Sequence, residues 1–162
     1  METRQVLCIV FRRNIQTREY EFLLLKRIPE KGSFWQPPSG GVESFDLSLT
    51  DAALREVWEE TGISQNNILK VIKDVYQFTF ENHYLTDEKI EPQTEYVFGF
   101  EVDSAVAVSL DQNESNEHDE FRWVSFDAAL KLLKWDNNKD AFMALQTILT
   151  QNKSDKENSL TF

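Results

Sequence analysis

The stretch GGVESFDLSLTDAALREVWEETGI, residues 40–63, determines how the rest of the chain can be interpreted. Apolar residues recur in it at helical spacing from Leu49 to Val57, with Ala52 and Ala53 between them. Ser48 or Thr50 can cap the start of this helix, and Gly62 can end it. The sequence therefore predicts an amphipathic helix that follows directly on a glycine-rich turn.

Three carboxylates lie on one stripe of the predicted helix. Each helical residue advances by about 100°, so Glu56, Glu59 and Glu60 fall within roughly one third of the circumference. Acids at these spacings repel one another, and Mg²⁺, which prefers oxygen ligands, relieves that repulsion. Arg55 can pair with one of the carboxylates and hold its orientation. The charge pattern alone is equally compatible with a solvated acidic helix face.

Short apolar runs on both sides of this helix have the pattern of β-strands. Gly and Pro cluster in residues 28–47, which predicts an irregular, turn-rich segment. Polar loops are expected at 82–93 and 111–120. The predicted strands cover residues 5–11, 20–27, 68–81, 94–102, 106–110 and 121–124.

Two further helical patterns follow, at residues 126–134 and 139–151, with a break near Asp136–Asn138. The domain is expected to span residues 1–151, and residues 152–162 are expected to form a polar, frayed C-terminal tail. Strands, a central helix, more strands and terminal helices indicate a mixed α/β domain, with helices on both faces of one sheet.

Composition limits the possible partners. The chain has 162 residues, which suits one domain, and a formal net charge of -11, which disfavours nucleic-acid and membrane-surface binding. There is one cysteine, Cys8, and no run of about 18 apolar residues or signal-peptide pattern. We therefore expect a cytoplasmic protein, and both a monomer and a homodimer remain open.

Residues 40–63 closely resemble the Nudix box, written as Gly, five residues, Glu, seven residues, Arg-Glu-U-x-Glu-Glu-x-Gly-U, where U is bulky and aliphatic. The second half matches at each fixed position from Arg55 to Ile63. Counting back from Arg55, the early Glu position falls on Leu47. Counting forward from Gly40 reaches Asp46, with one extra residue before the helix. We prefer the second alignment and expect Asp46 to be structural, through contacts with the loop and Arg55.

The resemblance implies a Nudix-type α/β/α sandwich and a metal-dependent pyrophosphohydrolase. Glu56, Glu59 and Glu60 would bind Mg²⁺, for which Mn²⁺ can substitute, and the carbonyl of Gly40 or Gly41 would complete the shell. Arg55, Glu56 and Glu59 would belong to the catalytic machinery.

A later acid is also implied. The segment EHDEFRW, residues 117–123, resembles one in which the Glu before His lies at the metal site. This maps a base or metal ligand onto Glu117, beside His118, with Glu120 as the reserve candidate. The alternative is that Glu117 is a solvated charge in an acidic loop.

Likeness outside the box indicates the substrate class. EFLLLKR, FWQPPSGGVE, FRWVSFDAAL and KWDNNKDAF resemble the branch of dihydroneopterin triphosphate pyrophosphatases and dATP pyrophosphohydrolases. EFLLL, the WxPP string and EHxxxRW are also similar to asymmetric diadenosine tetraphosphate hydrolases. We expect a small nucleotide-like polyphosphate, foremost a nucleoside or pterin triphosphate. A dinucleoside polyphosphate, a diphosphate sugar and a non-catalytic Nudix-fold binding module are the alternatives.

Five residues are candidates for substrate binding. Lys26 and Arg27 end a predicted strand and can meet phosphates, or are surface cations. Trp35 can stack on a ring or wedge the loop in place. Trp135 and Asn137 can border a ring pocket, or pack and cap the last helices.

Overall fold

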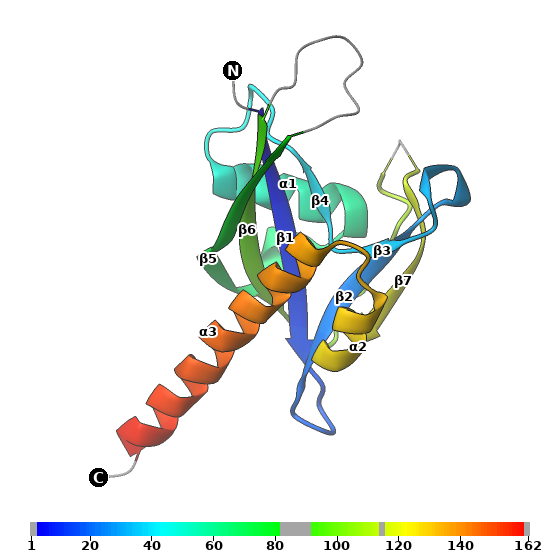
Figure 1. Cartoon of the computed structure of the whole chain (residues 1–162). Helices are drawn as coiled ribbons and strands as arrows, with labels where there is room; N and C mark the ends of the chain where they lie inside the picture. Colours follow the sequence, from blue (N-terminus) through cyan, green and yellow to red (C-terminus); the bar gives the residue numbers. More distant parts are fainter. Residues whose placement is uncertain (1–2, 82–91, 114–115, 161–162) are drawn as a thin grey trace.

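The computed structural model describes residues 3–81, 92–113 and 116–160, with side chains up to residue 152. Its centre is strand β1 (Thr3–Arg13), which pairs in parallel with β6 (Pro92–Val102) and antiparallel with β2 (Tyr20–Arg27). Over these residues the sheet has seven strands, in the order β3-β2-β1-β6-β5, with β4 on β1 and β7 on β2 (Figure 1). The remaining strands are β3 (Trp35–Gln36), β4 (Ser39–Gly41), β5 (Ile68–Glu81) and β7 (His118–Val124).

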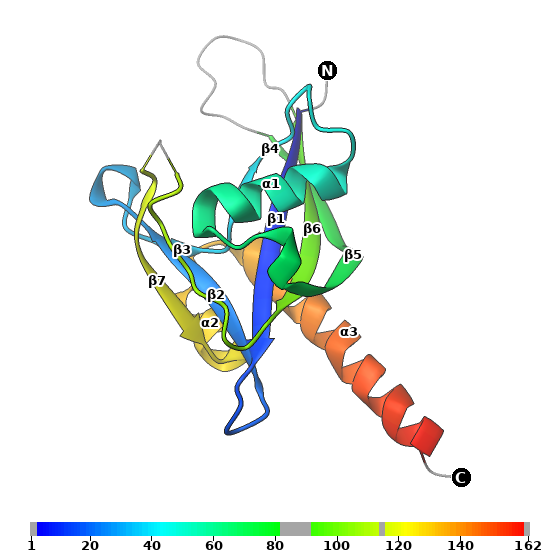
Figure 2. The ribbon, with the colours of Figure 1, turned by 180° about the vertical axis from the view of Figure 1, so that it is seen from behind.

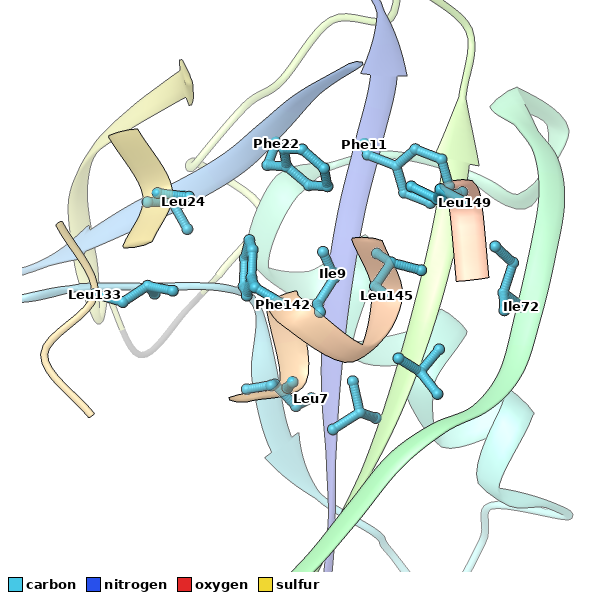
Figure 3. Packing of buried hydrophobic residues seen from close by; sticks show 14 of the residues in the cluster. Leu7, Ile9, Phe11, Phe22, Leu24, Ile72, Leu133, Phe142, Leu145 and Leu149 are labelled. Carbon is cyan, nitrogen blue, oxygen red and sulfur yellow. The ribbon is translucent and has the colours of Figure 1, made fainter. Parts of the chain in front are cut away.

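Helices cover both faces of the sheet, as the sequence predicted (Figures 1 and 2). Successive side chains of a strand point to opposite faces, so β1 contributes to two cores. Val6, Cys8 and Val10 pack with α1 (Leu49–Thr61). Leu7, Ile9 and Phe11 pack on the other face with α2 (Phe126–Leu132) and α3 (Asp136–Leu160), where Phe142 and Leu145 lie over the strand (Figure 3).

Strand bounds agree closely with the sequence at 20–27 and 68–81, and β1, β6 and β7 extend beyond the predicted ranges. The predicted strand at 106–110 is wrong. Val106 is buried, but its N–H donates to the Asp103 carbonyl in a turn, and the Ser109 N–H donates to the carbonyl of Thr61 at the end of α1. This apolar run therefore packs under α1 without joining the sheet.

The predicted break near Asp136–Asn138 is also misplaced, because α3 begins at Asp136. The chain is extended at Leu133, which pairs with Trp35 in an isolated bridge, so the break comes earlier. The helix then continues to Leu160, through most of the stretch expected to be a frayed tail, and extends away from the sheet (Figure 1). Its last core residue is Leu149, and the domain boundary at residue 151 stays a prediction.

The loop predicted at 82–93 lies outside the described residues, except for Pro92 and Gln93, which belong to β6. No helix in the described part of the chain is long and apolar enough to cross a membrane.

Candidate active site

Helix α1 directs two of its acids inward. The Ser48 side chain caps the helix by accepting from the Asp51 N–H at 3.1 Å, and Gly62 ends it in the left-handed region at φ 72°. Ala52, Ala53 and Val57 are buried on one side of the helix, and Glu56 and Glu60, each about one turn further along the same side, are buried with them. Glu56 and Glu60 are only 7% and 3% exposed, whereas the side chain of Glu59 is 45% exposed.

Arg55 and Asp46 join the glycine turn to the helix. Arg55 Nε donates to Asp46 Oδ1 at 3.0 Å and Nη2 to Oδ2 at 2.8 Å, a two-pronged ion pair of the strong kind. Asp46 Oδ2 also accepts from the Glu43 N–H at 2.8 Å, and these bonds from Arg55 and Glu43 hold the pKa of Asp46 below its ordinary value. These contacts with loop and arginine confirm the structural role expected for Asp46.

The same guanidinium reaches the acidic stripe. Arg55 Nη2 donates to the Gly41 carbonyl at 2.9 Å, and Nη1 lies 3.0 Å from Glu56 Oε1 and 3.3 Å from Glu59 Oε2. Arg55 was expected to orient one carboxylate and instead contacts three. Since the Gly41 carbonyl already accepts from Arg55, Gly40 is the better candidate for a carbonyl ligand.

One more acid and one histidine, Glu117 and His118 at the start of β7, meet Glu60 of α1. Ligand atoms of Glu60, Glu117 and His118 all lie within 4.8 Å of one another. Glu60 Oε2 accepts from the Ser39 N–H at 3.0 Å, and Glu117 Oε1 lies 3.7 Å from Lys31 Nζ. The structure thus brings together Glu60 and Glu117, which the sequence proposed, and adds His118, which it noted only as a neighbour.

Burial and mutual repulsion disfavour the charged forms of these acids. Burial is the main cause that raises the pKa of Glu56 to about 7, with Glu59 and Glu117 raising it further and Arg55 opposing. Burial also raises the pKa of Glu60, followed by repulsion from Glu56. A divalent cation would offset both effects, and carboxylate and carbonyl oxygens form a donor set that hard cations accept. Glu56, Glu60, Glu117 and the Gly40 carbonyl therefore fit such an ion.

His118 is held neutral and in place. It is 4% exposed, and its Nε2 lies 3.0 Å from Nε2 of Gln36. Burial lowers the pKa of His118 to about 4, with Glu117 opposing the shift. An amide N–H bonded to a neutral ring fixes the ring orientation, so Gln36 acts as a positioning residue for His118.

A pocket of about 400 Å³ adjoins this group. Three of its residues connect it to the acids: the Ser39 N–H binds Glu60, Gln36 bonds to His118, and the positive charge of Arg27 favours the ionised form of Glu60. Arg27 Nε is buried and has no hydrogen-bond partner among the described residues. The complete lining comprises Gln5, Leu7, Arg27, Phe34, Gln36, Ser39, Phe78, Phe80, Glu81, Glu95, Trp135, Asn137 and Asn138.

The candidates for substrate binding separate into two groups. Arg27, Trp135 and Asn137 line the pocket, and the Trp135 ring stands edge-on to Phe34 at a centroid distance of 5.9 Å. Lys26 does not line it and lies 3.9 Å from Glu120 Oε2. Trp35 is 9% exposed and belongs to the core next to α2 and α3, so the structure favours its packing role over stacking on a ligand.

Gly40 provides a direct test of this geometry. A methyl group added there would overlap the carboxylate of Glu56, whereas one added at Gly41 would meet nothing within 4 Å. We expect Gly40→Ala to displace Glu56 and reduce kcat/KM for a polyphosphate by at least about 10-fold, the effect of a small misplacement at a reacting centre. Gly41→Ala should stay within about two-fold by the same reasoning. Equal rates in steady-state assays of the two variants would contradict the placement of Glu56.

Comparison with known proteins matches the chain along most of its length. The NUDIX domain model matches residues 1–146. An octanoyltransferase from Myxococcus xanthus is 33% identical over 122 residues, covering 75% of this chain but only 31% of that protein. The asymmetrical bis(5'-nucleosyl)-tetraphosphatase of Rattus norvegicus is 33% identical over 144 residues, covering 86% of this chain and 90% of the relative.

A solved structure supports the same assignment. The crystal structure of a candidate NUDIX hydrolase from Listeria monocytogenes superposes with a TM-score of 0.76 at 30% identity, covering 91% of this chain and 94% of the other. With the family model covering residues 1–146 and the Nudix box lying on α1 and its glycine turn, this chain belongs to the Nudix domain family.

Proposed function

We propose that the protein is a magnesium-dependent pyrophosphohydrolase that cleaves a phosphoanhydride bond in a nucleoside or pterin triphosphate. The observation that carries this proposal is the junction between buried acids and an aromatic pocket. Ser39 lines the pocket, and its N–H is bonded to Glu60 at 3.0 Å. A ring held in the pocket can therefore extend its phosphates toward Glu56, Glu60 and Glu117.

The pocket has separate features for the two ends of such a substrate. Phe34, Phe78, Phe80 and Trp135 offer aromatic faces and edges to a flat ring. Arg27 lines the pocket and offers a guanidinium to a phosphate oxygen. Lys26, which precedes Arg27 on β2, lies outside the pocket beside Glu120, and its contact with phosphate stays a prediction. In this orientation the anhydride lies beside the acids.

The chemistry follows from the acid cluster. A bound Mg²⁺ ion would stabilise the negative charge of the phosphate oxygens and lower the pKa of a water molecule in the site. Glu56, Glu60 and the Gly40 carbonyl are the proposed ligands, with Glu59 at the exposed edge, and Arg55 keeps Glu56 and Glu59 in position. A water oxygen bonds to phosphorus, its proton passes to Glu117, and the bridging P–O bond breaks with its electron pair on the leaving phosphate.

One observation favours a second candidate, hydrolysis of a dinucleoside polyphosphate. The rat relative, named for activity on a bis-nucleosyl tetraphosphate, covers 86% of this chain. Diphosphate sugars and a binding role without turnover remain alternatives that the product assay below distinguishes. The cytoplasmic location and the choice between monomer and homodimer stay predictions.

The central experiment is a panel of polyphosphates incubated with Mg²⁺ and analysed for the released products. A triphosphate should yield pyrophosphate and a monophosphate, whereas diadenosine tetraphosphate would yield ATP and AMP if the second candidate holds. Glu60→Gln and Glu59→Gln should each reduce kcat by at least about 10²-fold, and Glu117→Gln by about 10²–10⁴-fold if it is the base.

Glu19→Gln makes the same chemical change at an exposed carboxyl in the loop between β1 and β2 and should leave the rate unchanged. Release of no product from any polyphosphate would overturn the hydrolase assignment. Normal turnover by Glu60→Gln would remove the proposed metal ligand.

The acid cluster also predicts how stability varies with pH. The pKa of Glu56 is about 7 in the folded chain, against an ordinary value of 4.5. Between these values the folded chain binds more protons than the unfolded one, so Glu56 makes stability fall as the pH rises. In urea titrations with EDTA, the free energy of unfolding of the wild type should fall between pH 5 and pH 7.5. It should fall by about 1–3 kcal/mol more than that of Glu56→Gln over the same range. Parallel pH profiles for the two proteins would show that Glu56 is not buried as described.

A further inference from the structure

Glu95 is a buried carboxyl that the proposed chemistry does not use. It lies on β6, between Gln5 on β1 and Phe78 on β5 in the sheet register. It is 7% exposed and lines the same pocket as Arg27 and Trp135. Among the described residues no hydrogen-bond donor or cation is bonded to its carboxylate, and burial alone raises the pKa of Glu95 to about 7.

The Glu95 carboxyl is largely removed from water, and its oxygens stay accessible only from the pocket that the residue lines. Burying a charged or polar group without a hydrogen-bond partner destabilises a protein, and a solvent-facing strand position would avoid that cost. Gln5, its neighbour across the ladder, is a neutral amide on the same face of the sheet. Because no donor of the described chain is bonded to the Glu95 carboxylate, a ligand in the pocket can supply the donors.

The position of Glu95 defines which part of a ligand it would meet. Arg27 belongs to β2 and Glu95 to β6, and these strands flank β1 on opposite sides. The Arg27 side adjoins Ser39 and the acids, where phosphates are expected. The Glu95 side adjoins Phe78 and Phe80, whose ring centroids are 5.8 Å apart. A ring lying against these aromatic side chains would present its edge to Glu95.

We propose that Glu95 is a specificity-determining residue that selects rings with a ring N–H and an exocyclic amino group side by side, as in guanine and 2-amino-4-oxopteridines. This rests on the proposed function and narrows its substrate class. A carboxylate has two acceptor oxygens at the spacing of these two donors. Adenine pairs a donor with an acceptor on its edge, and uracil lacks an amino group, so neither satisfies both oxygens.

The sharpest test compares GTP with ITP, which differ only by the 2-amino group. Wild-type enzyme should favour GTP in kcat/KM by about 10- to 100-fold, the discrimination typical of a lost two-pronged contact. In Glu95→Gln the preference should collapse to about two-fold or less, because the amide offers one acceptor and adds a donor.

Glu19→Gln is the matched control, since Glu19 is an exposed carboxyl outside this pocket, and it should keep the preference for GTP. The wild-type comparison needs no variant, so it stands even if Glu95→Gln folds poorly in a thermal melt. Equal use of GTP and ITP by wild type, a preference for ATP, or an intact preference in folded Glu95→Gln would each overturn the role of Glu95.

Binding separates this inference from the hydrolase assignment. Quenching of tryptophan fluorescence by GMP and IMP reports ring recognition without turnover. One outcome is that no polyphosphate is cleaved, while wild type binds GMP more tightly than IMP and Glu95→Gln does not. In that case the role of Glu95 in ring recognition holds and the proposed reaction fails. If GMP and IMP bind equally or not at all, the ring assignment fails whatever the enzyme hydrolyses.

Discussion

The guanidinium of Arg55 links the glycine turn to the acidic face of α1, and the geometry of the site depends on that link. It bonds to both oxygens of Asp46, to the Gly41 carbonyl and to two glutamates on its own helix. Without this cation, the turn before the helix would carry Asp46 without its ion-pair partner. On the same turn, Gly40 lies so close to Glu56 that a side-chain methyl would overlap the carboxylate.

The sheet connects this acidic group to the ring pocket. β1 supplies one core on the α1 face and another on the α3 face, and β4 pairs with it where Ser39 bonds to Glu60. The acids therefore belong to one face and the aromatic pocket to the other, with Ser39, Gln36 and Arg27 at their junction. A polyphosphate that carries a flat ring has the length and charge distribution to occupy both.

Local signals in the sequence predicted the parts of the molecule that depend on neighbours along the chain. The caps of α1 and its acidic stripe follow from spacing within residues 40–63, and the structural role of Asp46 follows from the resemblance to the Nudix box. The strand predicted at 106–110 is wrong because apolar residues packed under a helix have the same composition as a short strand. His118, Gln36 and Glu95 could not be assigned because their burial depends on strand register, which brings together residues far apart in sequence. For Glu95, the sequence signal of a buried polar side chain was a charged residue inside an apolar strand pattern.

The claim that most directly needs testing is that buried acids of α1 gather a divalent cation beside the pocket. Crystals soaked in Mn²⁺ give an anomalous signal that locates the ion independently of any assumption about substrate. The account predicts a peak among the carboxylates of Glu56 and Glu60 and the Gly40 carbonyl, lost in Glu60→Gln. Crystals of the intact protein with no peak among these groups, or with Mn²⁺ bound only at exposed acids elsewhere, would contradict it.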